Sequence, residues 1–113
     1  GLHWGWNRLK EPSYAVRLVD PPYKHFDYFI EDDHIWFIVE DIYDKMWIYE
    51  GESRLIFDQV IPELYQLKEY YLVSKKYKWI ICEDHHGITH FSGKEIIGRI
   101  KTFEQENNEE IIQ

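Results

Sequence analysis

Residues 35–42 read Ile-Trp-Phe-Ile-Val-Glu-Asp-Ile, and this stretch decides the fold. It is rich in aromatic and β-branched residues, which favour strands. Successive side chains of a strand point to opposite faces, so Trp36 and Ile38 share one face while Phe37 and Val39 share the other. Because both faces are apolar, the pattern predicts a central strand that is covered on both sides.

Further strands are predicted on either side of this stretch. Short polar turns such as 31–33 and 50–53 separate them, and in the middle of the chain they indicate an antiparallel meander. The aromatic or β-branched runs expected to form the strands are 14–19, 26–30, 46–49, 70–74, 77–83 and 87–91.

Two segments change from a strand period to a helical one. The first follows Ser53, the expected N-cap, and Pro62 should kink or shorten it. The second opens with a capping box, in which Ser92 is the N-cap and Glu95 lies three residues on. The apolar stripes that define the helices are Ile56, Val60, Leu64 and Leu67 in the first, and Ile96, Ile97, Ile100 and Phe103 in the second.

Together these patterns predict an α+β fold with one antiparallel sheet of about five or six strands and two helices packed on it. The chain of 113 residues is expected to form a single domain, 1–113, with a hydrophobic core that needs no disulfide. Residues 1–24 are expected to be an irregular N-terminal arm, and 104–113 an acidic tail that frays.

The net charge of −8 lies in one segment. Between Asp27 and Glu52 there are nine acidic residues and one basic residue, whereas the rest of the chain has twelve of each. Such a field repels nucleic acid and steers basic proteins, although a merely solvated surface is the alternative interpretation. The residues predicted to bind a basic protein partner are Asp32, Asp33, Asp41, Asp44, Tyr43 and Tyr49.

A cytoplasmic protein is expected. There is no apolar stretch of the roughly 20 residues needed to span a membrane, and no signal peptide. The only cysteine, Cys82, lies in an apolar run, where a small buried residue is the expected role rather than a catalytic thiol.

The densest group of metal-ligand residues is Asp84, His85 and His86, followed by His90. Imidazole and carboxylate groups bind zinc and similar ions, so these four residues are the candidate metal ligands. The alternative is a hairpin turn whose side chains bind the local backbone. The order of strand, His-His-Gly, strand and helix resembles the ββα-metal nuclease unit, but residues 94–101 offer no helix ligand. No cofactor is predicted.

Residues 69–86, EYYLVSKKYKWIICEDHH, resemble the C-terminal half of a family of small bacterial proteins of unknown function. In that family a similar phrase, YxVSKKYxWLxxENHH, recurs, and residues 35–51 are similar to its WxIVED…KxWxYEG. The resemblance covers roughly 26–91 and implies a bacterial cytosolic origin without an activity. In size and charge the chain also resembles the immunity proteins of bacterial toxins, although the N-terminal pattern of their SUKH superfamily is not visible.

The sequence favours binding over catalysis. The leading hypothesis is a protein-binding module of the immunity type, which neutralises a basic toxin domain by occlusion. A small metal-binding protein or metal-dependent hydrolase, using the Asp84, His85, His86 and His90 group, is the first alternative. A structural subunit that associates with copies of itself is the second.

Overall fold

The computed structural model describes residues 13–40, 43, 45–64 and 69–112. Its elements, in order, are β1 Ser13–Val16, η1 Pro22–His25, α2 Phe26–Phe29, β2 His34–Glu40, β3 Met46–Glu52, α3 Ser53–Leu55, η2 Ile56–Val60, α4 Ile61–Leu64, β4 Glu69–Ser74, β5 Ile80–Glu83, β6 Thr89–Ser92, α5 Lys94–Glu106 and η3 Asn108–Glu110. None of the described helices is long and apolar enough to cross a membrane.

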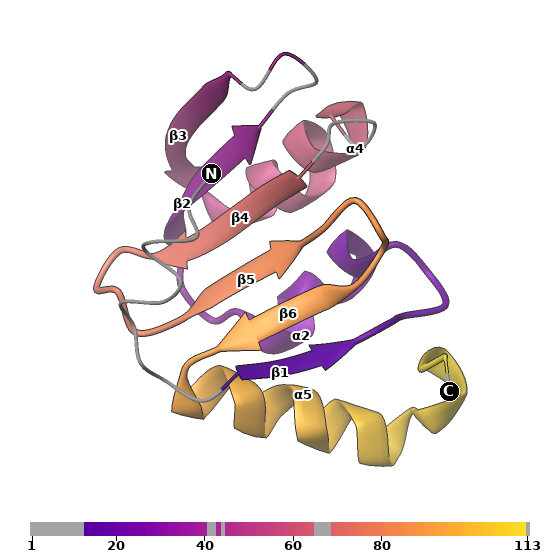
Figure 1. The fold of residues 1–113 in the computed structure, drawn as a ribbon. Coiled ribbons are helices and arrows are strands. Elements are labelled where there is room, and N and C mark those ends of the chain that lie inside the picture. The colour runs from indigo at the N-terminus through magenta and orange to yellow at the C-terminus, as the bar shows by residue number, and fades with distance from the viewer. Residues whose placement is uncertain (1–12, 41–42, 44, 65–68, 113) are drawn as a thin grey trace.

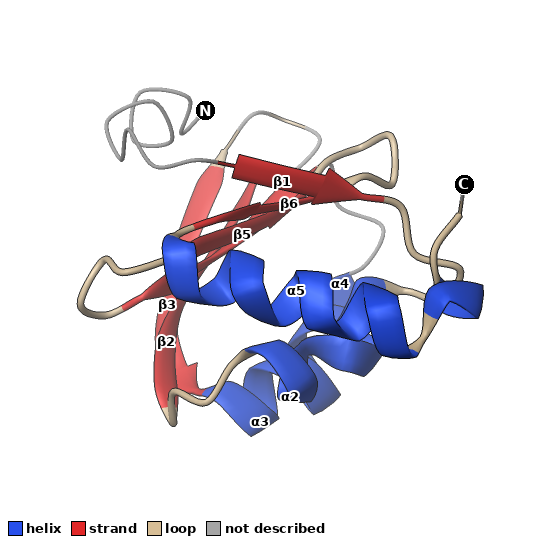
Figure 2. Ribbon diagram, turned by 90° about the horizontal axis from the view of Figure 1, so that it is seen from below, coloured by secondary structure: helices blue, strands red, loops and turns tan. Residues whose placement is uncertain are grey.

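The six strands form one antiparallel sheet in the order β1-β6-β5-β4-β2-β3 (Figure 1). The helices lie on one face of this sheet (Figure 2). The predicted α+β fold with a single antiparallel sheet is therefore confirmed. β2 pairs along both edges, with β3 and with β4. The expected coverage of both its faces is not found among the described residues, because the helices cover one face and Trp36 and Ile38 on the other face are half-buried.

The core lies between the sheet and the helices. Ile35, Phe37 and Val39 point from β2 into it and are almost fully buried, because alternate residues of the strand face the helices. The apolar stripe of α5, which was predicted at Ile96, Ile97, Ile100 and Phe103, is buried against the same core. A smaller cluster of Tyr71, Val73 and Cys82 lies apart from this core, with Trp36, Ile38 and Ile80 packed around it.

The prediction of a strand at 26–30 is wrong. Pro22 opens the 3₁₀ helix η1, where its fixed φ is favourable, and the chain continues directly into the short helix α2. Phe26 and Phe29, three residues apart, are fully buried, whereas Asp27 and Tyr28 are exposed. The helical spacing of the two phenylalanines buries both of them on one face, and this outweighs the strand preference of the aromatic residues.

Both helix starts differ in detail from the prediction. Ser53 is the first residue of α3 rather than its N-cap, and its hydroxyl donates to the backbone oxygen of Asp32. Ser92 is paired in β6 and buried, so the cap position of α5 falls to Gly93. Before Pro62, which has no N–H to donate, the helix widens into the π-helical turn η2.

The end of the chain packs on the domain, in contrast to the expected fraying from Glu104. Helix α5 continues to Glu106, and η3 follows it. Leu18 then forms an antiparallel bridge with Ile111, flanked by a hydrogen bond of 2.8 Å from the Val19 N–H to the Glu110 oxygen. The last described residues are thus held beside the segment that follows β1.

Candidate functional site

The edge strand β3 exposes a row of large apolar side chains. Within the described residues it pairs with β2 alone, at the edge of the sheet. Trp47 is 50% exposed and Ile48 is 63% exposed, and Met46 and Tyr49 are also exposed. Natural sheets usually protect such an edge with charges, proline or a covering element. An edge strand of seven residues with an uncharged, apolar half is therefore a candidate surface for a partner.

The register of β3 places these side chains on both faces of the sheet. Tyr49 lies opposite Phe37, on the face that carries the helices, and their rings stack with centroids 6.0 Å apart. Ile48 lies opposite Ile38, on the other face. Because both faces of the strand are apolar, a partner strand added at this edge would find apolar contacts above and below its backbone.

A pocket of about 480 Å³ lies where β3 ends and β2 begins. His34, the first residue of β2, pairs with Glu52, the last residue of β3, so the loop before β2 meets the end of the edge strand. The pocket is strongly acidic, and the basic residues in its lining are Arg54 and His34. Its acidic lining residues are Asp27, Glu31, Asp32, Asp33 and Glu52.

The structure separates the predicted acidic residues. Asp33 lines the pocket and is exposed, whereas Asp32 is half-buried and accepts a hydrogen bond of 3.2 Å from the Trp79 indole. Asp41 and Asp44 lie outside the described residues. Tyr43 is 76% exposed and lies in the turn after β2. Asp33 precedes the other end of this strand, whose seven residues span about 23 Å. Asp33 and Tyr43 therefore do not share one site.

Some of the negative charge between Asp27 and Glu52 is matched by nearby bases. Glu31 lies 3.1 Å from the Arg99 guanidinium, and Glu50 forms an ion pair with Lys75. These pairs are exposed on at least one side, so each contributes little to stability. They reduce the negative field at that end of the hairpin, and one of the paired acids, Glu31, also lines the acidic pocket.

The predicted metal ligands between Asp84 and His90 form a hydrogen-bonded turn. Asp84 Oδ1 accepts from the N–H groups of His86 and Ile88, at 2.9 and 3.0 Å, and its Oδ2 lies 2.9 Å from His90 Nε2. His85 instead lies 3.3 Å from a Glu69 carboxylate oxygen. This is the geometry of the alternative interpretation, a turn whose side chains bind local groups, and it leaves the Asp84 carboxylate engaged on both oxygens.

A different group of ligand-type residues comes together elsewhere. In the part of the chain that the structure describes, Asp20, His25 and Glu110 have ligand atoms that all lie within 4.8 Å of one another. These residues are 90 positions apart in the sequence at the extremes, so no local spacing could have indicated them. Metal binding by the Asp84 group remains a prediction.

The carboxyl of Asp84 is held in its charged form. Desolvation by burial alone would raise its pKa, but hydrogen bonds from His90 and from the backbone of Ile88 and His86 outweigh this effect, and the pKa is lowered. Burial also raises the pKa of the Cys82 thiol, and the residue is buried, as expected for a small apolar role.

Removing the Asp84 carboxylate is expected to destabilise the domain at neutral pH. Asp84→Ala leaves the N–H groups of His86 and Ile88 without their acceptor, which should lower the free energy of unfolding by about 1–3 kcal/mol. A carboxyl with a lowered pKa stabilises the fold above its ordinary pKa of about 3.9, and this contribution is lost as the pH falls through the lowered value. Urea denaturation should therefore show a deficit that shrinks in strong acid.

Asp84→Asn is the control for this prediction, since an amide oxygen can still accept from the two backbone N–H groups. It should lose less stability than Asp84→Ala at neutral pH. A deficit of Asp84→Ala that is the same at neutral pH and below about pH 3 would show that the charge of this carboxyl plays no part.

The sequence analysis missed Met46, Trp47 and Ile48 as surface residues, and Asp27, Glu31 and Glu52 as members of one pocket. The apolar run 46–49 predicts a strand, but nothing local says that the strand lies at an edge. The pocket depends on the pairing of His34 with Glu52, which brings two loops together. A count of charges between Asp27 and Glu52 is the signal in the sequence that indicates this region.

Comparison with known proteins adds a family. A family model described as "Family of unknown function (DUF6756)" matches residues 1–104. No curated protein and no solved structure matches the chain.

Proposed function

The chain belongs to this family of unknown function, and we propose that it is a non-catalytic protein-binding module that takes an extended segment of a basic protein along β3. The observation that carries the proposal is the continuity of two features. An edge strand that pairs with β2 alone among the described residues, and that carries apolar side chains on both faces, runs directly into a pocket lined by five acidic residues.

The mode of binding would be β-strand addition. The N–H and C=O groups of β3 that do not pair with β2 would supply hydrogen bonds that do not depend on sequence, and the exposed side chains would select alternate residues of the partner. Trp47 and Tyr49 would contact one face of the added strand, and Ile48 the other. Aromatic residues of this kind supply much of the energy at protein interfaces.

The acidic pocket would set the choice of a basic partner. A lysine or arginine at one end of the added segment can enter the pocket and meet Asp33 and Glu52. The negative field of the segment between Asp27 and Glu52 raises the rate of encounter with positively charged proteins. Neutralisation of a basic toxin domain by occlusion is the most concrete form of this function.

Self-association is the second candidate, because an exposed edge strand can also pair with its copy. Two copies of β3 would bring together two segments that each carry the whole −8 charge of the chain. This repulsion disfavours a homodimer at low salt. Light scattering that shows a dimer, lost on Ile48→Lys, would replace the basic partner with a second copy of the chain.

The test is capture of basic proteins by the immobilised chain from a lysate of its native host, with elution by rising salt. We expect Trp47→Lys/Ile48→Lys to abolish capture, and Asp33→Lys/Glu52→Lys to slow association with the purified captured protein by about 10-fold at low salt. Asp32 is left unchanged, because its contact with Trp79 belongs to the fold.

The matched control is Glu109→Lys together with Glu63→Lys, a reversal of two exposed acids outside the segment. It changes the net charge by as much as the pocket variant does and should leave capture intact. The proposal fails if the β3 and pocket variants capture the same proteins at the same salt as the unmodified chain. It also fails if the captured protein is not basic.

A further inference from the structure

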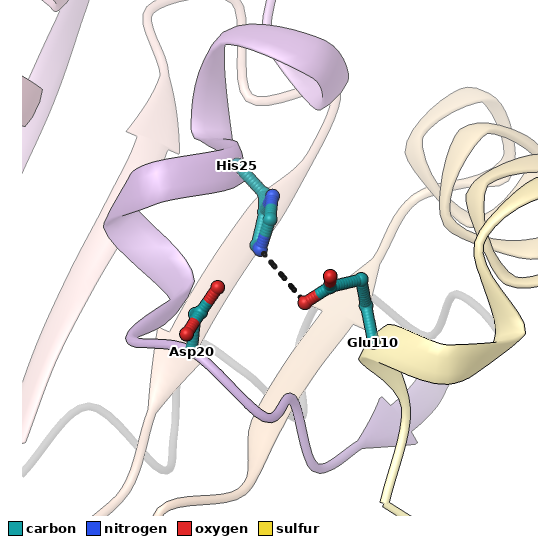
Figure 3. Close-up of side chains that lie close together, drawn as sticks. All are labelled: Asp20, His25 and Glu110. Carbon is teal, nitrogen blue, oxygen red and sulfur yellow. Dashed lines mark ion pairs between the residues drawn. The ribbon is translucent and has the colours of Figure 1, made fainter.

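Asp20, His25 and Glu110 form a compact group where three parts of the chain meet. Figure 3 shows their side chains pointing toward one another, His25 from η1, Asp20 from the segment before it, and Glu110 from η3. Their ligand atoms lie within 4.8 Å of one another, and all three residues are half-buried rather than on the open surface. The group thus differs from the exposed acids that are common on any protein.

His25 has one ring nitrogen that lacks a hydrogen bond within the described residues. Its Nε2 is buried and has no hydrogen-bond partner among the described residues. The nearest carboxylate oxygen, Glu110 Oε2, lies 3.9 Å away, which is too long for a hydrogen bond. A buried polar atom without a partner is rare in folded proteins and calls for an explanation. The ring also packs against Phe103, with centroids 5.1 Å apart, which limits the directions that Nε2 can take.

The backbone around the group is well held. Two prolines, Pro21 and Pro22, follow Asp20 directly and restrict its neighbours in φ. The Val19 N–H donates to the backbone oxygen of Glu110 at 2.8 Å, so the residue before Asp20 is hydrogen-bonded to Glu110. The two carboxylates are therefore brought together by the fold, although their charges repel.

The geometry points to a binding site for a divalent transition-metal ion, of which zinc is the best match, with Asp20, His25 and Glu110 as ligands. Zinc binds imidazole nitrogen and carboxylate oxygen at about 2.0–2.2 Å, so neighbouring ligands around a tetrahedral ion lie about 3.4 Å apart. The 3.9 Å between His25 and Glu110 is close to this value. Magnesium and calcium prefer sites made of oxygen alone, and the imidazole disfavours them.

A metal ion here would neutralise the two carboxylates and give the orphan nitrogen a partner. It would also link η1 to η3, and so hold the end of the chain to the segment after β1. Three protein ligands leave at least one position for water. Glu110 lies beyond residues 1–104, the part matched by the family model, so the match does not extend to this ligand.

The test is titration of the metal-free chain with zinc, by calorimetry and by thermal denaturation. We expect one zinc ion per chain, and a rise of roughly 10 °C in Tm at a 100-fold excess over Kd. His25→Gln and Glu110→Gln should each weaken zinc binding by about 100-fold or more, because each removes a direct ligand.

Two controls separate this site from other zinc-binding residues. Glu109→Gln changes the exposed neighbour of Glu110 on the same helix, and His85→Gln/His86→Gln removes the histidines of the turn at Asp84. Both should bind zinc as the unmodified chain does. If His25→Gln does not fold, Glu110→Gln decides the result, since Glu110 lies closer to the surface.

Several results would overturn the inference. Absence of zinc binding by the unmodified chain would mean that the three residues do not form a zinc site. Unchanged zinc binding by Glu110→Gln would show that Glu110 is not a ligand. Loss of binding in His85→Gln/His86→Gln alone would assign the zinc to the turn at Asp84.

Discussion

Replacing Gly93 by alanine is expected to lower the free energy of unfolding by about 3 kcal/mol or more, a large part of the roughly 5–15 kcal/mol that is ordinary for a domain. Gly93 has a φ of 117°, a conformation that residues with a side chain rarely adopt. A Cβ atom built there would lie 2.5 Å from the backbone oxygen of Lys78 and 3.0 Å from Trp79 Cα. Both neighbours are backbone atoms next to β5, and they cannot move aside without disturbing the sheet.

The matched control is Gly98→Ala, in the middle of α5. A Cβ at Gly98 meets nothing within 4 Å, and alanine is the better helix former by about 1 kcal/mol. This variant should therefore be as stable as the unmodified chain or more stable, with a higher urea midpoint. Equal midpoints for Gly93→Ala and the unmodified chain would mean that the connection before β5 can shift, contrary to the packing described.

Truncation of Phe29 is expected to cost about 3–5 kcal/mol of unfolding free energy. The side chain is fully buried in α2, and its ring meets Phe91 of β6 and Phe103 of α5 at centroid distances of 5.3 Å, in edge-to-face geometry. Phe29→Ala removes these contacts from both the sheet and the long helix and leaves a cavity between them. Urea denaturation followed by circular dichroism measures the loss.

Leu55→Ala is the control for this deletion, because Leu55 is a large apolar residue that is 47% exposed. It should change the free energy of unfolding by less than about 1 kcal/mol. If Phe29→Ala were no more destabilising than Leu55→Ala, the segment 22–29 would contribute little to the core, and the description of α2 as part of it would be wrong.

The sequence predicts those parts of the fold whose signal is local. The apolar run at 35–42 gives β2, and the stripe from Ile96 to Phe103 gives α5. The stripe also reports which side chains face the core, whereas β2 is apolar on both faces and does not. The segment 26–30 misleads, since its aromatic residues favour a strand while Pro22, a few positions earlier, starts a helical turn. The cap of α5 falls on Gly93 for a reason that lies in the packing against Lys78 and Trp79.

The candidate sites are harder to predict, because they depend on contacts between distant segments. The charge count indicates the region from Asp27 to Glu52, but only the pairing of His34 with Glu52 makes part of it a pocket. The charge pattern does not distinguish Asp32 from Asp33, but Asp32 accepts a hydrogen bond from Trp79, 47 residues away. Long-range contacts of this kind leave no periodic signal in a single sequence.

The position of β1 in the sheet has a consequence for synthesis of the protein on the ribosome. β1 pairs with β6, so Ser13 cannot pair in the sheet until Ser92 has been translated. The hairpin of β2 with β3, and then β4 and β5, can pair in order as the chain emerges. During most of translation, the sheet therefore grows without its first strand, and a nascent chain that stalls before β6 exposes the unfinished edge of β5 to other proteins.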